Sequence, residues 1–188
     1  MEEEVHKDIL SILGEIKKAV ELKDIMLLKR ISDQTIHNSS LYQDRNSVSV
    51  AVLSYSLSKL YERERYHLFK GWSGFEKMLK TAFDSMIDDL EKHNYPLFEE
   101  HREGLFKSIA KLDNRLRKHV QFVIHRARIS KSSRLYEHGL SLGRTATLMG
   151  ISQFELMDYI GSTWIADVKE GISTNAVERL KIARRVFK

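Results

Sequence analysis

Two pairs of residues in this chain have a spacing that could hold a metal ion. Glu3 with His6 and Glu64 with His67 each follow the Glu-x-x-His pattern, which in helical bundles binds a di-iron centre together with two further inward glutamates. The spacing is common by chance, both pairs fall near expected helix ends, and no pair of buried glutamates is evident. We therefore expect no metal and no other cofactor.

Residues 30–37 contain two patterns that occur in hydrolytic enzymes. Asp33 and His37 stand one helical turn apart beside Ser32, but an Asp–His pair at this spacing is more often a surface pair or a cap. Arg30 and His37 have six residues between them, which meets the bare Arg-x4–6-His spacing of a family of helical ribonucleases. That resemblance rests on two residues alone. The chain also lacks glycine-rich phosphate-binding loops, so we expect no enzyme and keep a ribonuclease as an alternative.

A run of basic residues suits a different chemistry, the binding of phosphate groups. No acidic residue lies between Asn114 and Tyr136. The cations of this run are Arg115, Arg117, Lys118, Arg126, Arg128, Lys131 and Arg134. On one long helix they could follow a phosphate backbone, and phosphate contacts confer affinity without sequence information. The alternative is an ordinary solvated helix face, but the complete absence of acids favours a surface for a polyanion.

Charge is segregated along the whole chain in the same sense. The net charge is +5, yet residues 1–110 hold 16 Lys and Arg against 19 Asp and Glu, whereas residues 111–188 hold 15 against 7. A second basic cluster ends the chain on an expected terminal helix: Arg179, Lys181, Arg184, Arg185 and Lys188. A polyanionic partner would therefore meet the C-terminal part of the protein.

Between the two clusters, Leu140–Gly161 has the spacing of a helix-turn-helix. The residues that carry this pattern are Ala146, Gly150, Ser152, Glu155 and Leu156. Ala146 is the small residue needed where the two helices cross, and Gly150 can adopt the positive φ of the turn. Ser152 and Glu155 form a capping-box pattern at the start of the second helix. The alternative is a plain packing unit of three helices.

The segment Arg134–Gly161 resembles the helix-turn-helix module of a family of short prokaryotic, antitoxin-like proteins, whose order is Y-x-x-G-x-S-L-G-x-A-A-x-L-x-G-x-S-x-x-E. The matching residues are Tyr136, Gly139, Ser141, Leu142, Gly143, Ala146, Leu148, Gly150, Ser152 and Glu155. Thr145 stands in place of the first alanine. The resemblance covers about 28 of the 188 residues. It implies a DNA-binding or toxin-binding regulator and says nothing about the preceding bundle.

The second helix of this module is poorly suited to reading bases. Its expected exposed face carries Gln153, Glu155 and Asp158, and no Arg or Lys lies between residues 151 and 161. Carboxylates repel phosphates, and guanine is usually read by Arg or Lys. We place Gln153, which could read adenine, and Arg144 in the predicted nucleic-acid-binding set. The basic run should still supply most of the affinity.

The elements that must position these residues are helices. With one proline and nine glycines in 188 residues, the chain has too few breakers for many short strands. Apolar residues recur at helical spacing. We expect helices over residues 3–22, 25–38 (capped by Asp24), 47–66, 73–93 (capped by Ser73) and 98–128. Leu41 and Tyr42 should pack back on the core.

The sequence therefore predicts an all-α protein. A helical bundle over residues 1–130 should be followed, after a hinge at Lys131–Ser133, by a helix-turn-helix module with a basic terminal helix over residues 131–188. We expect a homodimer, because single helix-turn-helix modules seldom bind DNA well alone. The aromatic residues that could form its surface are Tyr61, Tyr66 and Trp72.

We expect a non-enzymatic regulator that binds nucleic acid, most simply DNA. One alternative is a ribosome- or RNA-associated factor that uses the same basic surface, and another is an antitoxin-like protein-interaction module. The chain has no cysteine, no apolar run near the roughly 18 residues of a membrane span and no secretory signal at its acidic start. These features suit a cytoplasmic protein without a membrane partner.

Overall fold

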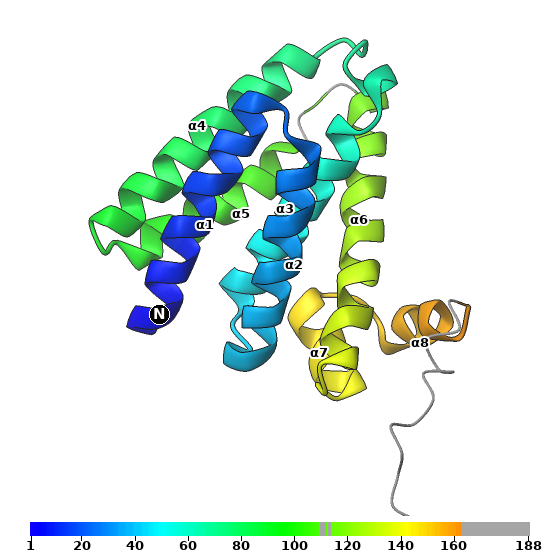
Figure 1. Ribbon diagram of the computed structural model, residues 1–188. Helices are drawn as coiled ribbons and strands as arrows, with labels where there is room; N and C mark the ends of the chain where they lie inside the picture. Colours follow the sequence, from blue (N-terminus) through cyan, green and yellow to red (C-terminus); the bar gives the residue numbers. More distant parts are fainter. Residues whose placement is uncertain (110–111, 113, 163–188) are drawn as a thin grey trace, which may run out of the picture.

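The computed structural model describes residues 1–109, 112 and 114–162, and these ranges contain helices and no strand (Figure 1). The α-helices are α1 (Glu3–Leu22), α2 (Ile25–Tyr42), α3 (Arg45–Tyr61), α4 (Trp72–Glu91), α5 (Tyr95–Ile109), α6 (Asn114–Glu137), α7 (Leu142–Met149) and α8 (Gln153–Ser162), and a 3₁₀ turn, η1 (Glu64–Tyr66), follows α3. The predicted all-α fold is confirmed. None of the described helices is long and apolar enough to cross a membrane.

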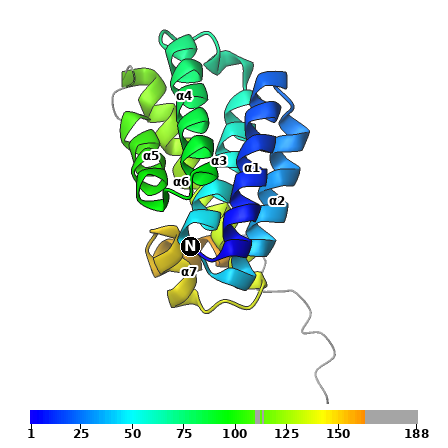
Figure 2. The same cartoon turned by 90° about the vertical axis from the view of Figure 1, so that its left-hand side faces the viewer.

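The first six helices form a bundle, and the short α7 and α8 lie beside the end of α6 (Figures 1 and 2). α3 is the central helix, in contact with α1, α2, α6 and α7. Its serines allow α2 to approach closely: Ser32 Oγ donates to the carbonyl of Ala51, and Ser54 Oγ to that of Leu28, both at 2.8 Å. These buried hydroxyls are hydrogen-bonded, so their burial costs little.

The ends of α2 show both a confirmed and a wrong prediction. Asp24 accepts a hydrogen bond from the amide of Leu27 at 2.9 Å, as an N-cap side chain does. The helix continues to Tyr42, past its predicted end near residue 38. Leu41 is 67% and Tyr42 38% exposed. The prediction that these two residues pack on the core is wrong, because the extra helical turn directs them outward.

The connection between α3 and α4 folds back and buries its aromatic residues. Tyr61, Tyr66 and Trp72 are at most 5% exposed, and the rings of Tyr61 and Trp72 meet edge to face with their centres 5.6 Å apart. The predicted exposed aromatic surface is therefore wrong, since these rings cover one another. α4 begins at Trp72, behind Gly71, and no side chain caps it. Ser73 lies inside the helix and is not its cap.

The long helix predicted over residues 98–128 is in fact two helices. α5 ends at Ile109, and α6 begins at Asn114. Apolar residues keep helical spacing across this break because each helix buries its own apolar side. The connection contains neither proline nor glycine, so no helix breaker marks it. Pro96 lies in the first turn of α5, where its missing N–H costs nothing.

The predicted hinge at Lys131–Ser133 lies inside α6, and all three residues are buried. The two serines donate hydrogen bonds to carbonyls of their own helix at 2.7 and 2.8 Å, so they need no solvent. α6 therefore continues from the bundle to α7 without a break. The division into residues 1–130 and 131–188 stays a prediction, and the predicted basic terminal helix lies outside the described residues.

Candidate nucleic-acid interface

α7 and α8 are joined by a tight turn at Gly150, whose φ of 64° is left-handed. At the start of α8, the amide of Ser152 donates to Glu155 Oε2 at 2.8 Å, and the amide of Glu155 donates to Ser152 Oγ at 3.1 Å. The Ser152 hydroxyl also donates to this carboxylate, and the two bonds lower the pKa of Glu155. Ala146 and Leu156 are buried. The expected turn and capping box are thus present, while the helix-turn-helix assignment stays a prediction.

The residues before α7 also follow the expected order. Gly139, with a φ of 93°, comes just after α6, and Ser141 Oγ accepts a hydrogen bond from the amide of Arg144 at 3.3 Å. The Arg144 guanidinium donates to the side-chain and backbone oxygens of Gln43 at 3.3 and 3.5 Å. Arg144, one of the predicted nucleic-acid contacts, therefore connects α7 to the end of α2.

α8 turns an acidic and apolar side toward solvent. The residues of this side are Gln153, Phe154, Met157 and Asp158. Phe154 is 84% exposed, the helix contains no Arg or Lys, and Glu155 Oε1 lies 3.4 Å from Nε2 of His125 on α6. A phosphate backbone would be repelled here. α8 therefore presents no Arg or Lys to a nucleic acid.

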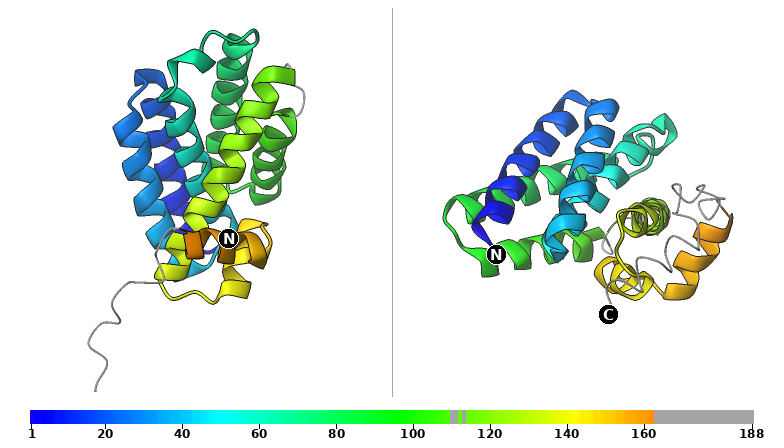
Figure 3. Two further views of the ribbon diagram at one scale, coloured as in Figure 1. Left: turned by 90° about the vertical axis from the view of Figure 1, so that its right-hand side faces the viewer. Right: turned by 60° about the horizontal axis from the view of Figure 1, so that its bottom comes forward.

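The basic residues of α6 do not share one face. Arg115, Lys118 and Arg126 are exposed, and Phe122, 55% exposed, lies one turn from both Lys118 and Arg126. α6 crosses the surface of the molecule in the left view of Figure 3. Arg117 and Arg134 bond to their own helix: Arg117 donates to Asn114 at 2.8 Å, and Arg134 pairs with Glu137 at 3.1 Å.

Lys131 is a correction to the predicted set. It is 3% exposed, and its Nζ donates to Asp33 Oδ1 at 2.7 Å and lies 4.3 Å from the centre of the Tyr55 ring. Burial lowers the pKa of Lys131, and Asp33 opposes that shift. A side chain buried in this way has no access to a phosphate backbone, so Lys131 drops out of the set. Arg128 faces a cleft, described below.

Two arginines that sequence reasoning missed extend the exposed side of α6. Arg63 and Arg65 lie 5.7 and 5.4 Å from the centre of the Tyr66 ring, and Arg115 lies 4.9 Å from that of the neighbouring Phe69 ring. The adjacent Glu62 and Glu64 make the segment look neutral in the sequence, which hid both arginines. We call Arg63, Arg65, Arg115, Lys118, Phe122 and Arg126 the α6 cationic face.

The α6 cationic face is long enough for several phosphates. Its part from Arg115 to Arg126 spans about 17 Å at about 1.5 Å per residue, or about five base-pair steps of a duplex. Beside it, a groove of about 350 Å³ is lined by Lys59, Phe122, Arg126 and Tyr159 among others. Residues of α3, α6 and α8 line this groove. Phe122 is 55% exposed at its edge, so its ring can contact a partner.

The two histidines of the candidate metal-binding pairs pack against other rings. His6 stacks on His93 with ring centres 4.6 Å apart, and His67 lies 4.5 Å from the Trp72 ring. Within the described ranges, no three His, Asp or Glu residues gather in a way that could hold a metal ion.

The residues of the ribonuclease alternative lie together on α2. Arg30 and His37 line one shallow depression with Asp33. The Asp33 carboxylate is bonded to Lys131, and the His37 ring lies 5.1 Å from the His138 ring. This alternative therefore still rests on the spacing of two residues.

Comparisons with known proteins assign no family to this chain. No family model, no curated protein and no solved structure matches it significantly. Function has to be inferred from the geometry of the described residues.

Proposed function

We propose that this protein is a non-enzymatic, nucleic-acid-associated regulator that binds a phosphate backbone along the α6 cationic face. One observation carries the proposal. The α3–α4 connection and α6 bring five cations and an exposed phenylalanine to one side of the bundle. Cations that neutralise phosphates release condensed counterions, and each such contact adds to the affinity.

In this proposal, α7 and α8 form a helix-turn-helix module that positions the nucleic acid without reading its bases. The left-handed turn at Gly150 and the Ser152–Glu155 capping box support the module. The acidic and apolar surface of α8 argues against base readout. A homodimer completes the proposal, because two copies double the phosphate contacts. Its interface does not use Tyr61, Tyr66 or Trp72, which are buried.

Duplex DNA is the first target to test, and structured RNA is a second candidate that a specific residue favours. Phe122 is exposed between Lys118 and Arg126, and an exposed ring beside cations can stack on an unpaired base. A third candidate, an antitoxin-like protein contact, is favoured by the exposed Phe154 and Met157 on α8.

The decisive measurement is a fluorescence-anisotropy titration of the whole chain with duplex DNA and with an RNA hairpin at several salt concentrations. If about five phosphates are neutralised, affinity should fall about 500-fold between 50 and 200 mM salt. Absence of binding to both probes at about 50 mM salt, or binding that salt leaves unchanged, contradicts the proposal.

Matched variants on α6 localise the surface. Arg126→Gln should weaken binding about 3- to 10-fold and reduce the salt slope by about 1. Arg128→Gln, two residues away and facing the cleft, should leave both unchanged. Phe122→Ala separates the targets: a loss of fivefold or more on the hairpin alone indicates RNA. Binding of a protein partner that Phe154→Ser abolishes, with no nucleic-acid binding, would favour the third candidate.

A further inference from the structure

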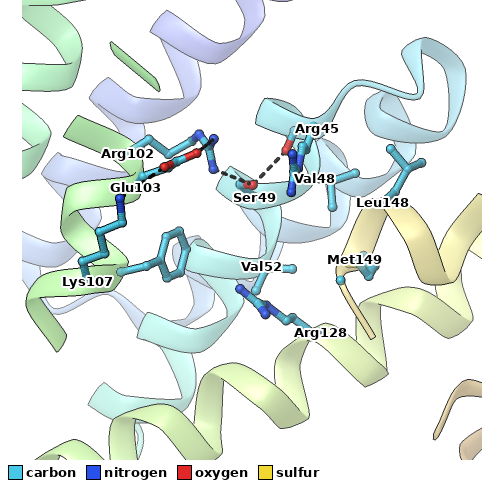
Figure 4. A pocket seen from close by; sticks show the side chains of 12 residues that line it. Arg45, Val48, Ser49, Val52, Arg102, Glu103, Lys107, Arg128, Leu148 and Met149 are labelled. Carbon is cyan, nitrogen blue, oxygen red and sulfur yellow. Dashed lines mark hydrogen bonds and ion pairs between the residues drawn. The ribbon is translucent and has the colours of Figure 1, made fainter. Parts of the chain in front are cut away.

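A cleft of about 300 Å³ opens on the side of α6 that Arg128 faces. Its walls come from α3, α5, α6 and the end of α7 (Figure 4). Val52, Phe106 and Met149 contribute apolar surface. Its charged lining residues are Arg45, Arg102, Glu103, Lys107 and Arg128. A volume of this size is at the lower end of the range for sites that hold small ligands.

Arg102 lies deep in the cleft and is incompletely paired. Its side chain is 11% exposed, its Nη1 donates to Ser49 Oγ at 3.3 Å, and its Nη2 lies 3.7 Å from Glu103 Oε1. Its Nε is buried and has no hydrogen-bond partner among the described residues. Arg45 stands on the other side of Ser49 (Figure 4). Burial lowers the pKa of Arg102 and the charge of Arg45 lowers it further, whereas the carboxylates of Glu103, Glu99 and Asp44 raise it.

Arg128 reaches the cleft from α6 without a carboxylate partner. Its guanidinium carbon lies 5.9 Å from the centre of the Phe106 ring. None of the ion pairs in the described part of the chain includes Arg128. The charged group that acts on its pKa is another cation, Arg45. Burial lowers the pKa of Arg128, and Arg45 lowers it further.

The residues that line the cleft carry more positive than negative charge. Four cations line it with one carboxylate, and Glu103 is shared between Arg102 at 3.7 Å and Lys107 at 3.5 Å. Glu99 and Asp44 act on Arg102 from outside the lining, and among the described residues no carboxylate acts on Arg128. Half-buried guanidinium groups without a counter-charge are costly to desolvate, and like charges repel. An anion that enters the cleft from solution would offset both costs.

We propose that this cleft binds a small phosphate-bearing molecule. Arg45 and Arg102 would hold the phosphate, and Arg128 would approach it from α6, while the Ser49 hydroxyl donates to the carbonyl of Arg45 at 2.8 Å and orients Arg102. A guanidinium group can donate two parallel hydrogen bonds to phosphate oxygens. A phosphomonoester carries about two negative charges at neutral pH, which would balance the excess positive charge of the residues that line the cleft. The Phe106 ring and its apolar neighbours offer a wall for the remainder of the molecule.

A nucleic-acid backbone is not the occupant in this proposal. The phosphates of a duplex contact side chains that protrude from a surface, whereas the Arg102 side chain is only 11% exposed. Arg126 and Arg128 are separated by about 200° around α6, so a duplex along the α6 cationic face does not reach the cleft. The cleft is therefore a second site, independent of the proposed function.

The test uses the whole chain in a buffer without phosphate or sulfate, with thermal unfolding and calorimetric titration. The probes are inorganic phosphate, 5′-AMP and adenosine. Inorganic phosphate at about 10 mM should raise the melting temperature by about 2–5 °C. 5′-AMP should bind at least threefold more tightly than inorganic phosphate, because its nucleoside covers the apolar wall. Adenosine, which lacks the phosphate, should leave the melting temperature unchanged.

Arg102→Gln and Arg128→Gln should each lose at least tenfold in affinity for both phosphate probes, and Arg126→Gln should lose none. Arg45→Gln changes an exposed residue at the cleft and serves if the buried variants fail to fold; it should lose about threefold or more. Equal stabilisation of all variants by phosphate would show a general salt effect and overturn the site. If 5′-AMP binds no more tightly than inorganic phosphate, the contact with Phe106 is wrong.

Discussion

Arg126 and Arg128 stand two residues apart on α6, yet they belong to different regions of the molecule. Arg126 is exposed on the α6 cationic face, where water solvates its charge. Arg128 is half-buried beside Phe106 and faces Arg45 and Arg102 across a cleft. An exposed cation is stable without a partner, whereas a desolvated one is not. An arginine on the exposed side of α6 is therefore stabilised by water. On the cleft side, we propose that a bound anion stabilises it.

Lys131 supplies the control for this comparison, since it lies on the same helix and is buried more deeply than Arg128. There the chain provides its own counter-charge: Lys131 Nζ donates to Asp33 Oδ1 at 2.7 Å. A cation that serves only to join α6 to α2 is thus neutralised internally. In the cleft, Glu103 is the one carboxylate among the lining residues, beside four cations, and no carboxylate in the described part of the chain acts on Arg128. The difference distinguishes a structural ion pair from the cleft for which we propose an anion.

The largest expected effect comes from removal of this internal counter-charge. Asp33→Asn should lower the free energy of unfolding by about 2 kcal/mol, because Lys131 stays buried while its ion pair is lost; the cost is smaller than for a fully buried pair because the Asp33 side chain is 68% exposed. Urea denaturation at neutral pH measures the change. The matched control is Asp158→Asn on the exposed side of α8, which should stay within about 0.5 kcal/mol of the native protein. Equal results for the two variants would remove the distinction between Lys131 and the cleft.

A smaller effect of opposite sign is expected in the cleft. Arg128→Met replaces a half-buried, unpaired cation by an apolar side chain beside Phe106. In a buffer without phosphate it should raise the free energy of unfolding by about 1 kcal/mol, and Arg126→Met should not change it. At saturating phosphate the native protein should become the more stable of the two, because only it binds the ion. Destabilisation of Arg128→Met in both buffers would show that Arg128 is an ordinary packing residue.

Features that depend on neighbouring residues were predictable from the sequence. The Asp24 cap, the left-handed Gly150 and the Ser152–Glu155 capping box each involve backbone groups within four residues. Such groups satisfy one another locally, so the residue types alone indicate the geometry. The separation of Arg126 from Arg128 also follows from helical periodicity, but which of the two sides is covered does not.

Features that depend on distant segments were not predictable. Asp33 and Lys131 are 98 residues apart in sequence, and the arginines of the cleft come from α3, α5 and α6. Spacing shows which residues share one side of a helix, whereas the packing of other helices decides which charges are desolvated. The α5–α6 break was also missed, because apolar residues continue a helical pattern across it in the sequence.

The smallest expected effect concerns the two exposed ion pairs of Glu62, which lines the groove beside the α6 cationic face. Glu62 accepts hydrogen bonds from Lys29 at 2.9 Å and Lys59 at 2.8 Å, which lower its pKa from 4.5 to about 2. Since this folded-state pKa lies below the unfolded value, the unfolded state takes up the proton first as pH falls. The contribution of Glu62 is therefore complete above about pH 4.5 and is lost toward about pH 2.

Solvent limits the size of this contribution, because the three side chains are 30–40% exposed. Glu62→Gln should cost about 0.5 kcal/mol at pH 6.5 and less at pH 3, measured by urea denaturation. Added salt at about 0.5 M should also shrink the cost, since exposed charges are screened, whereas the cost of Asp33→Asn should shrink by a smaller fraction because Lys131 is buried although Asp33 is exposed. If Glu62→Gln and Asp33→Asn lower the free energy of unfolding equally, and salt changes both costs equally, burial does not set the strength of these ion pairs. The contrast between the exposed and the desolvated charges of this protein would then lose its physical basis.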